Sequence, residues 1–233
     1  MGLANGVHHL AICTGNIKAQ IEFFTDVLGA ELTALYWMHG VENTFHGFLR
    51  FNDSCSVAFV QNEKIAATAP VLGVSHAANP GSPSAPGTMQ HVAFNVDSEA
   101  DLLALRDRIR DRGINVYGAV DHGFCKSIYF AGPEGLNLEI STSDSAIDAR
   151  AWIDPEVVAL AGIDAAELER YKSPPSYSNR TGAAVANPPI DETKPHMVFP
   201  KAAYEKLMGA PDEVIAAQRS HPTPPVSVKE SEA

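Results

Sequence analysis

Cysteine, basic residues and long apolar runs are all scarce or absent in this sequence. The three cysteines, Cys13, Cys55 and Cys125, are widely spaced and form no Cys-x-x-Cys pair, so neither a disulfide framework nor a cysteine zinc site is expected. Lys and Arg number 17 against 28 Asp and Glu, which leaves a net charge of −11 at pH 7. This balance excludes the clustered cations of a nucleic-acid surface.

No apolar run approaches the roughly 20 residues that cross a bilayer. The amino terminus, MGLANGVHHLAI, has neither the basic segment nor the apolar core of a secretion signal. These absences predict a cytoplasmic protein with neither nucleic acid nor membrane as a partner. What the sequence does have is material for a core: 45% of its 233 residues are hydrophobic and only 19% are charged, which is typical of globular proteins.

An internal repeat organises the first part of the chain. The segment HHLAICTGNIKAQIEFFTDVLGAEL is similar to the later segment QHVAFNVDSEADLLALRDRIRDRGINV, with His9 aligned with His91 and Ala11 with Ala93. In both segments an apolar–polar alternation with the period of a half-buried strand precedes a helical pattern. Because self-similarity of this kind marks a repeated structural unit, we expect two copies of one module.

Start and stop signals bound the helix of each copy. In the first copy an apolar stripe at helical spacing runs from Ile17 to Leu28, and Gly29 follows where a left-handed cap would end the helix. In the second copy Ser98 begins a capping box and Gly113 is the stop. Both copies therefore predict one helix directly after the first strand.

Three further strand-like runs follow each helix. They read AELTALYWM, FHGFLRF and CSVAFVQ in the first copy, and INVYGAV, SIYFAG and LNLEIST in the second. The chain thus predicts an α+β fold in which two tandem βαβββ modules, at about residues 6–62 and 88–145, form an open barrel of curved sheet around a pocket. The connecting loop, residues 63–87, is rich in Ala, Pro, Gly and Ser, a composition that flexible linkers and functional loops share.

Beyond residue 145 the repeat pattern stops, which predicts a domain at 1–145 and a C-terminal extension at 146–233. Ten of the 16 prolines follow position 173, so the extension should be irregular, with one or two short helices within 154–171 and another near 202–209. We expect it to pack on the domain or on a neighbouring subunit, and its last residues, 220–233, to be mobile.

Two histidines and one glutamate are the candidate metal ligands. His9 and His91 hold the same repeat position, and Glu139 lies among apolar neighbours in LNLEI, where a charged carboxylate is costly unless it is paired or bound to metal. Two imidazoles and one carboxylate hold a divalent metal when they converge from rigid strands that face one cavity. Either histidine alone would indicate an ordinary hydrogen-bonded residue, but the repeat and Glu139 together favour the metal site.

Other polar residues are expected to have no such role. Alternation along a strand should direct His8 away from the face that carries His9. Glu134, in the Pro-Glu-Gly turn, should be solvated. Solvent-facing roles are also expected for His39, His46, His196 and His221.

The repeat, the VLGAEL helix exit and the SIYFAGPEGLNLEI ending resemble the vicinal oxygen chelate superfamily over about residues 6–145. This superfamily includes glyoxalases, fosfomycin- and bleomycin-resistance proteins, epimerases and type I extradiol dioxygenases. The resemblance implies that His9, His91 and Glu139 are the metal ligands. Glyoxalase-like members usually add a carboxylate on the last strand of the first module. Here that strand, CSVAFVQ, has none near its centre, which favours a three-ligand site with open positions.

Within the superfamily, VDHGFCKSIYFAGPEGLNLE is similar to the signature of extradiol dioxygenases. By that similarity His122 and Tyr129 match the histidine and tyrosine that hydrogen-bond the substrate, and Glu139 matches the iron ligand. Gly132 departs from the signature, because an acidic or polar residue usually precedes the proline. His76, in the connecting loop, matches the active-site acid–base histidine less specifically, and an ordinary loop histidine is the alternative.

The resemblance implies a non-haem Fe(II) enzyme, with Mn(II) or another divalent metal as the alternative, that cleaves the ring of a substituted catechol with O2. Two other classes stay open. One is a different metal-dependent member, such as an isomerase, a lyase or a glyoxalase-like enzyme, and the other is a metal-free protein that binds or sequesters a small molecule. Metal identity and oxygen uptake separate the first two classes, and retained function without His9 or Glu139 would indicate the third. A homo-oligomer is also expected.

Overall fold

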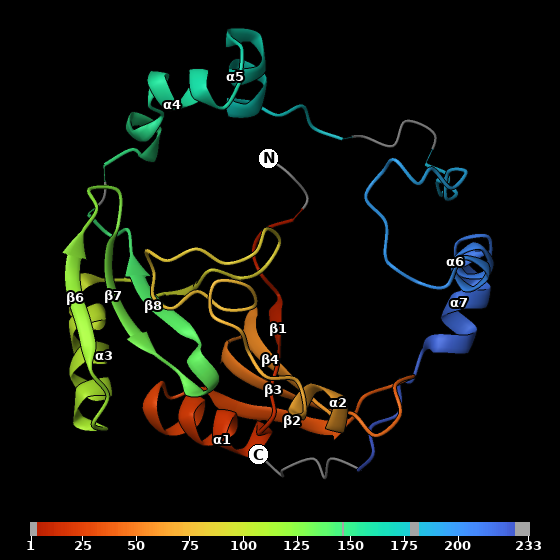
Figure 1. Ribbon diagram of the computed structural model, residues 1–233, viewed down its shortest axis with the longest axis horizontal. Helices are drawn as coiled ribbons and strands as arrows, with labels where there is room; N and C mark the ends of the chain where they lie inside the picture. Colours follow the sequence, from red (N-terminus) through yellow and green to blue (C-terminus); the bar gives the residue numbers. More distant parts are fainter. Residues whose placement is uncertain (1–3, 146, 178–181, 227–233) are drawn as a thin grey trace. The chain divides into compact units, whose positions relative to one another are not determined.

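The computed structural model describes residues 4–145, 147–177 and 182–226. Its contacts divide the chain into two units: the first runs to Trp37 and continues over Asn43–Pro175, and the second joins Met38–Glu42 to the chain from Ser176 onward. The repeat lies in the first unit, where each copy forms its own four-stranded sheet (Figure 1). The predicted α+β fold with two βαβββ modules is therefore confirmed, and both sheets are open.

The first module pairs a mixed sheet with an interrupted helix. Its strands are β1 (His9–Cys13), β2 (Glu31–Trp37), β3 (Phe45–Asn52) and β4 (Cys55–Gln61). They lie in the order β1-β4-β3-β2, with β1 parallel to β4 and the other pairs antiparallel. The single helix that the sequence predicts is divided into α1 (Ile17–Glu22) and a π-helical turn, η1 (Phe23–Val27). It stops at the predicted Gly29, whose φ of 79° is a left-handed conformation that glycine adopts without strain.

The second module repeats this arrangement. Its strands are β5 (Val92–Asn95), β6 (Val116–Asp121), β7 (Lys126–Ala131) and β8 (Asn137–Thr142), and a 3-10 turn, η2 (Pro133–Gly135), joins the last two. The order is β5-β8-β7-β6, with β5 parallel to β8. Helix α3 (Glu99–Asp111) covers one face of the sheet (Figure 1). As predicted, the Ser98 hydroxyl accepts a hydrogen bond from the Asp101 backbone and Gly113 ends the helix with a φ of 77°.

Aromatic packing joins the two modules into one core. Phe24, which is fully buried, meets Phe59 of its own module at a ring-centroid distance of 5.2 Å and Phe94 of the second module at 6.2 Å. Phe51 lies 4.5 Å from the same Phe94 ring. Buried aromatic pairs of this kind add specific edge and face contacts to the burial of apolar area. The hydrophobic core of the first unit therefore includes side chains from both modules.

A polar contact also joins the modules, at Glu134. Its carboxylate accepts hydrogen bonds from the Thr14 hydroxyl at 2.5 Å, from the Gly15 backbone N–H at 2.7 Å and from the Gln20 side-chain amide at 3.0 Å. Glu134 is exposed, as expected, but its carboxylate is also hydrogen-bonded, because η2 reaches the start of α1 in the other module. Thr14 and Gln20 are themselves buried, so Glu134 supplies a hydrogen-bond acceptor to two buried polar side chains.

The connecting loop is packed against the second module. A short helix, α2 (Glu63–Ala66), begins it. Further along, Ala77 is buried, and its carbonyl accepts a hydrogen bond of 2.7 Å from the side chain of Asn137 on β8. The loop is therefore packed on the second module at Ala77, and a functional role for it stays a prediction.

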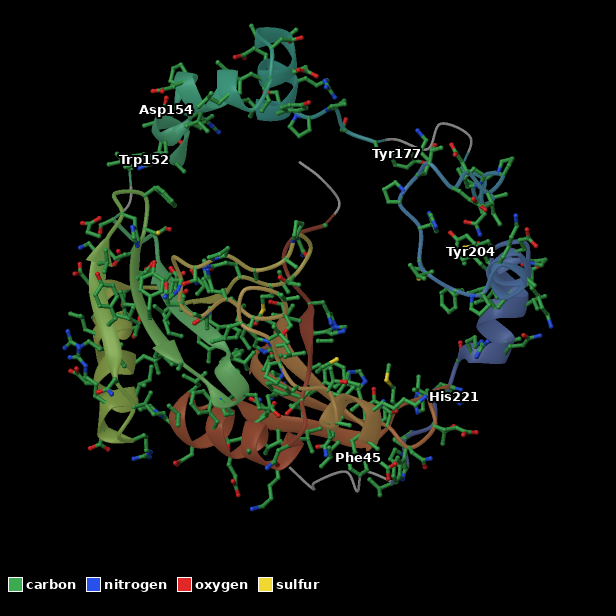
Figure 2. The ribbon with its side chains drawn as sticks, viewed as in Figure 1. Phe45, Trp152, Asp154, Tyr177, Tyr204 and His221 are labelled. Carbon is green, nitrogen blue, oxygen red and sulfur yellow. The ribbon has the colours of Figure 1, made fainter. Side chains whose placement is uncertain are left out.

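The described residues of the C-terminal region include short helices separated by residues without regular secondary structure. These helices are η3 (Ala149–Trp152), α4 (Pro155–Leu160), α5 (Ala165–Lys172), α6 (Lys201–Met208) and α7 (Asp212–Arg219). The predicted helices within 154–171 and near 202–209 are present, whereas α7 was not predicted. Asp154, labelled in Figure 2, caps α4 by accepting from the Glu156 backbone N–H, and Trp152 packs at 5.5 Å on Phe124.

Two further points concern the predicted extension. Helices α4 and α5 group with the first unit, and the domain boundary near residue 145 stays a prediction. The predicted mobile end lies partly outside the described residues, which stop at 226. Within the described part of the chain, each helix is too short or too polar to traverse a membrane.

Candidate metal centre

Two of the three predicted metal ligands meet in the second module. Glu139 lies on β8 with only 5% of its surface exposed, and the parallel register pairs it with Ala93 of β5. His91 immediately precedes β5. Its Nε2 atom lies 2.9 Å from Oε2 of Glu139. The pairing that the sequence predicts between this imidazole and this carboxylate is present.

Gln90 orients His91, a role that the sequence analysis missed. The side-chain nitrogen of Gln90 lies 2.5–3.2 Å from the carbonyl oxygens of Asn79, Pro80 and Ser82 in the connecting loop. Because only the NH2 end of the amide can donate to carbonyls, its oxygen must be the end that faces the Nδ1 atom of His91, which it contacts. An amide followed by a predicted ligand histidine was the available signal, but nothing in the sequence places the loop carbonyls beside it.

The orientation of the His91 ring decides whether its contact with Glu139 suits a bound cation. An imidazole that donates from Nδ1 to Gln90 has, in its neutral form, a lone pair on Nε2. That lone pair faces a carboxylate oxygen, so two acceptors lie 2.9 Å apart and require a positive species, either a proton or a metal ion. Metal-bound histidines commonly donate their other ring N–H in this way. His91 and Glu139 therefore fit a divalent cation by the chemistry of their donor atoms.

His9 does not join this pair in the structure. It begins β1 in the first module, where its ring lies 5.2 Å from Phe48 and its Nδ1 lies 2.9 Å from Nδ1 of His8. The expectation that His8 points away fails because His8 precedes the strand, where alternation does not apply. Among the described residues, no three His, Cys, Asp or Glu side chains come close enough together to hold a metal ion. The assignment of His9 as a ligand stays a prediction.

Tyr129 and His122 form a second pair close to Glu139. The Tyr129 hydroxyl lies 2.8 Å from Nε2 of His122, and Tyr129 is the cross-strand partner of Glu139 between β7 and β8. Burial raises the pKa of Tyr129; the neighbouring Ser127 side chain opposes this shift, and the Glu139 carboxylate reinforces it. Tyr129 is therefore a protonated phenol at neutral pH, able to donate to a substrate oxygen.

An aromatic cluster on the first module was also missed. The His46 ring lies 4.6 Å from Phe48 and 5.6 Å from Tyr36. Its Nε2 is buried without a hydrogen-bond partner, so the expected solvent-facing role is wrong. Burial, and secondarily the charge of His9, lower the pKa of His46 below its ordinary value. His46 is thus a neutral imidazole at pH 7. No sequence signal reveals this, because burial on β3 depends on its neighbours.

The predicted acid–base residue His76 lies at the junction of the modules. It lines a pocket of about 200 Å³ with Leu10–Cys13 of β1, with Met89 and Gln90, and with Gly135–Asn137. Its Nδ1 lies 2.9 Å from the Ser75 hydroxyl. A larger crevice of about 1230 Å³ between the modules has none of the six predicted site residues among its described lining. The role of His76 stays a prediction.

Comparisons with known proteins give a matching family model and similar relatives. A family model described as Glyoxalase/Bleomycin resistance protein/Dioxygenase superfamily matches residues 6–140. Biphenyl-2,3-diol 1,2-dioxygenase 2 of Rhodococcus globerulus is 26% identical over 148 residues, which are 63% of this chain and 68% of the relative. Biphenyl-2,3-diol 1,2-dioxygenase 3 of the same organism is 25% identical over 138 residues, 59% of this chain and 63% of that one.

The crystal structure of a glyoxylase/bleomycin resistance protein/dioxygenase domain from Frankia sp. EAN1pec superposes with a TM-score of 0.47 at 15% identity, over 60% of this chain and 98% of that chain. The two curated dioxygenases are matched over 68% and 63% of their length. The chain thus spans about two thirds of each of these relatives.

Proposed function

Because the chain belongs to the glyoxalase/bleomycin resistance protein/dioxygenase superfamily, we propose that it is a non-haem Fe(II)-dependent extradiol dioxygenase that cleaves a substituted catechol with O2. The observation that carries this proposal is the His91–Glu139 pair, two acceptors 2.9 Å apart that a cation would bridge. The similarity to the two biphenyl-diol dioxygenases supports the substrate class. Mn(II) is the alternative metal.

His91 and Glu139 would hold the metal, with His9 as the proposed third ligand through its equivalent repeat position. Two imidazoles and one carboxylate are the donor set that leaves adjacent open positions on Fe(II). When bound, Fe(II) supplies electron transfer between the catechol and dioxygen. The buried setting of Glu139 keeps water from competing for its carboxylate.

The polar residues beside the ligands would bind the substrate and move its protons. Tyr129, a protonated phenol 2.8 Å from His122, would donate a hydrogen bond to a catechol oxygen and stabilise negative charge that develops there. Through its contact with the Tyr129 hydroxyl, His122 would accept a proton that comes from the catechol and later return it. We propose His76 as the residue that exchanges a proton near dioxygen, on the strength of its loop position alone.

Anaerobic reconstitution tests this function. The purified protein is loaded with Fe(II), and oxygen uptake is followed over a panel of substituted catechols, with the ring-opened product identified by mass. We expect uptake with at least one catechol, loss of uptake in Glu139→Gln and His91→Ala, and full uptake in the control His196→Ala, whose ring contacts the Lys194 carbonyl. Absence of uptake across the panel in fully loaded protein would contradict the proposal.

One observation favours a second candidate, a protein that binds an aromatic molecule without metal. In the described residues three donors do not converge, and the rings of Tyr36, His46 and Phe48 line one face of the first sheet. Equilibrium dialysis of a catechol against metal-free protein distinguishes the two. Tight binding that survives Glu139→Gln, without oxygen uptake on Fe(II) loading, would support this second function.

A further inference from the structure

The second oxygen of Glu139 is occupied by a hydrogen bond from its own strand. Ser141 lies two residues after Glu139 on β8, so both side chains are on the same face of the sheet. The Ser141 hydroxyl donates to Oε1 of Glu139 at 2.6 Å, whereas Oε2 is the oxygen that faces His91. The two carboxylate oxygens therefore have separate partners.

A second serine supports the first. Ser127 on β7 is fully buried, is the cross-strand partner of Ser141, and has its hydroxyl oxygen 2.7 Å from that of Ser141. A hydroxyl has one hydrogen to donate. Because Ser141 uses its hydrogen on Glu139, Ser127 must donate to Ser141. The hydrogen bonds thus run in one direction, from Ser127 to Ser141 to Glu139.

We propose that Ser141, supported by Ser127, is a positioning residue. Its hydrogen bond occupies Oε1 of Glu139, so that Oε2 alone is free to bind a divalent cation. The terminal torsion of a glutamate is soft, so an unsupported carboxylate would rotate or offer both oxygens at once. The hydrogen bond makes Glu139 a one-oxygen ligand with a fixed direction. The inference rests on the metal-binding part of the proposed function and does not depend on the substrate.

Metal affinity tests the inference without any turnover. Co(II), which is stable in air and has ligand-sensitive absorption bands, is titrated into the metal-free full-length protein, and Fe(II) is then titrated anaerobically. We expect Ser141→Ala to weaken binding about 10–100-fold, as loss of a partner that orients a metal ligand commonly does, and to shift the Co(II) bands. Ser141→Thr, which keeps the hydroxyl on a strand, should restore both.

Two further variants separate positioning from packing. Ser127→Ala should weaken Co(II) binding less than Ser141→Ala, because Ser141 still donates to Glu139. Ser143→Ala is the matched control: it removes a serine hydroxyl two positions along, where the hydrogen bond goes to the Phe124 carbonyl, and should bind Co(II) like the wild type. Circular dichroism of each variant confirms folding before titration.

The outcomes decide the inference and the proposed function separately. Normal Co(II) affinity in folded Ser141→Ala would overturn the positioning role even if catechols are cleaved, and so would failure of Ser141→Thr to restore affinity. Weak binding in Ser141→Ala with recovery in Ser141→Thr would support the role even if no catechol is cleaved by the wild type. A wild-type protein that binds neither Co(II) nor Fe(II) would overturn both proposals.

Discussion

Replacing Glu134 by glutamine should destabilise the first unit through the contact between its modules. Glutamine keeps the size of the side chain and the left-handed backbone, φ 58°, of this position, but it removes the charge and turns one acceptor into a donor. Three donors, from Thr14, Gly15 and Gln20, then face a group that satisfies them incompletely. The change therefore isolates the polar contact from packing and backbone effects.

The magnitude follows from the hydrogen bonds. Each bond to a charged group contributes about 1.5–3 kcal/mol. Glutamine keeps one acceptor oxygen, and water replaces part of what is lost because Glu134 is an exposed residue, so we expect a total loss well below the sum for three bonds. A loss of about 2–3 kcal/mol corresponds to a fall of about 4–12 °C in Tm for a chain of this size. Thr14→Val, which removes one of the three bonds, should lose about 1 kcal/mol.

The pH dependence provides a second signature. Burial by itself raises the pKa of Glu134, but hydrogen bonds from Thr14, Gln20 and the backbone of Gly15 and Asn16 outweigh it and leave the pKa below its ordinary value of 4.5. A carboxyl with a lowered pKa in the folded state stabilises the protein above pH 4.5, and this contribution disappears as the pH falls through the lower folded value. The Tm difference between wild type and Glu134→Gln should therefore be full at pH 7 and shrink in acid.

Thermal unfolding by circular dichroism at neutral and acidic pH measures both effects. Glu63→Gln is the matched control, since Glu63 is exposed in the first turn of α2 and should change Tm little. Equal Tm values for wild type and Glu134→Gln at pH 7 would refute the proposed contact between the modules. A difference that persists unchanged in acid would show that the destabilisation comes from something other than the carboxylate charge.

Other variants probe the remaining polar groups. His46→Phe removes a buried nitrogen without a partner but also the contact of Nδ1 with the Tyr36 hydroxyl at 3.3 Å, so Tm at pH 7 should change little. Because the lowered His46 pKa makes the wild type lose stability as the pH falls below 6.5, this variant should unfold with a flatter dependence of Tm on pH. Gln90→Leu should weaken Co(II) binding about 10-fold or more by releasing His91, with Gln218→Leu on α7 as the control; equal affinities would argue against the orienting role. Tyr129→Phe should lower kcat for catechol cleavage about 10²-fold with Co(II) affinity unchanged, and an unaltered kcat would remove Tyr129 from the reaction.

Much of the fold and half of the candidate centre follow from short-range sequence patterns. Alternating strands, helices bounded by Gly29 and Gly113, and the tight turn before β8 are local features, and local spacing decides them. The proximity of Tyr129 to Glu139 also follows, because the strands are joined by a short turn and their register is fixed. The repeat marks the position of His91, and its contact with the Glu139 carboxylate is present, whereas its role as a metal ligand stays a prediction.

Contacts between distant parts of the chain decided the rest. Glu134 binds a residue 120 positions away, Gln90 is oriented by the carbonyls of a loop, and His46 loses solvent because of the rings around it; none of these contacts has a period or spacing that a sequence pattern can carry. His9 is the clearest case. Its repeat position predicts a ligand, but its distance from His91 and Glu139 depends on how two separately formed sheets pack. The sequence by itself determined the two modules and the polar side chains that each contributes. Only tertiary packing decided which of these side chains come into contact, because that geometry is a sum of many weak contacts across the interface between the modules.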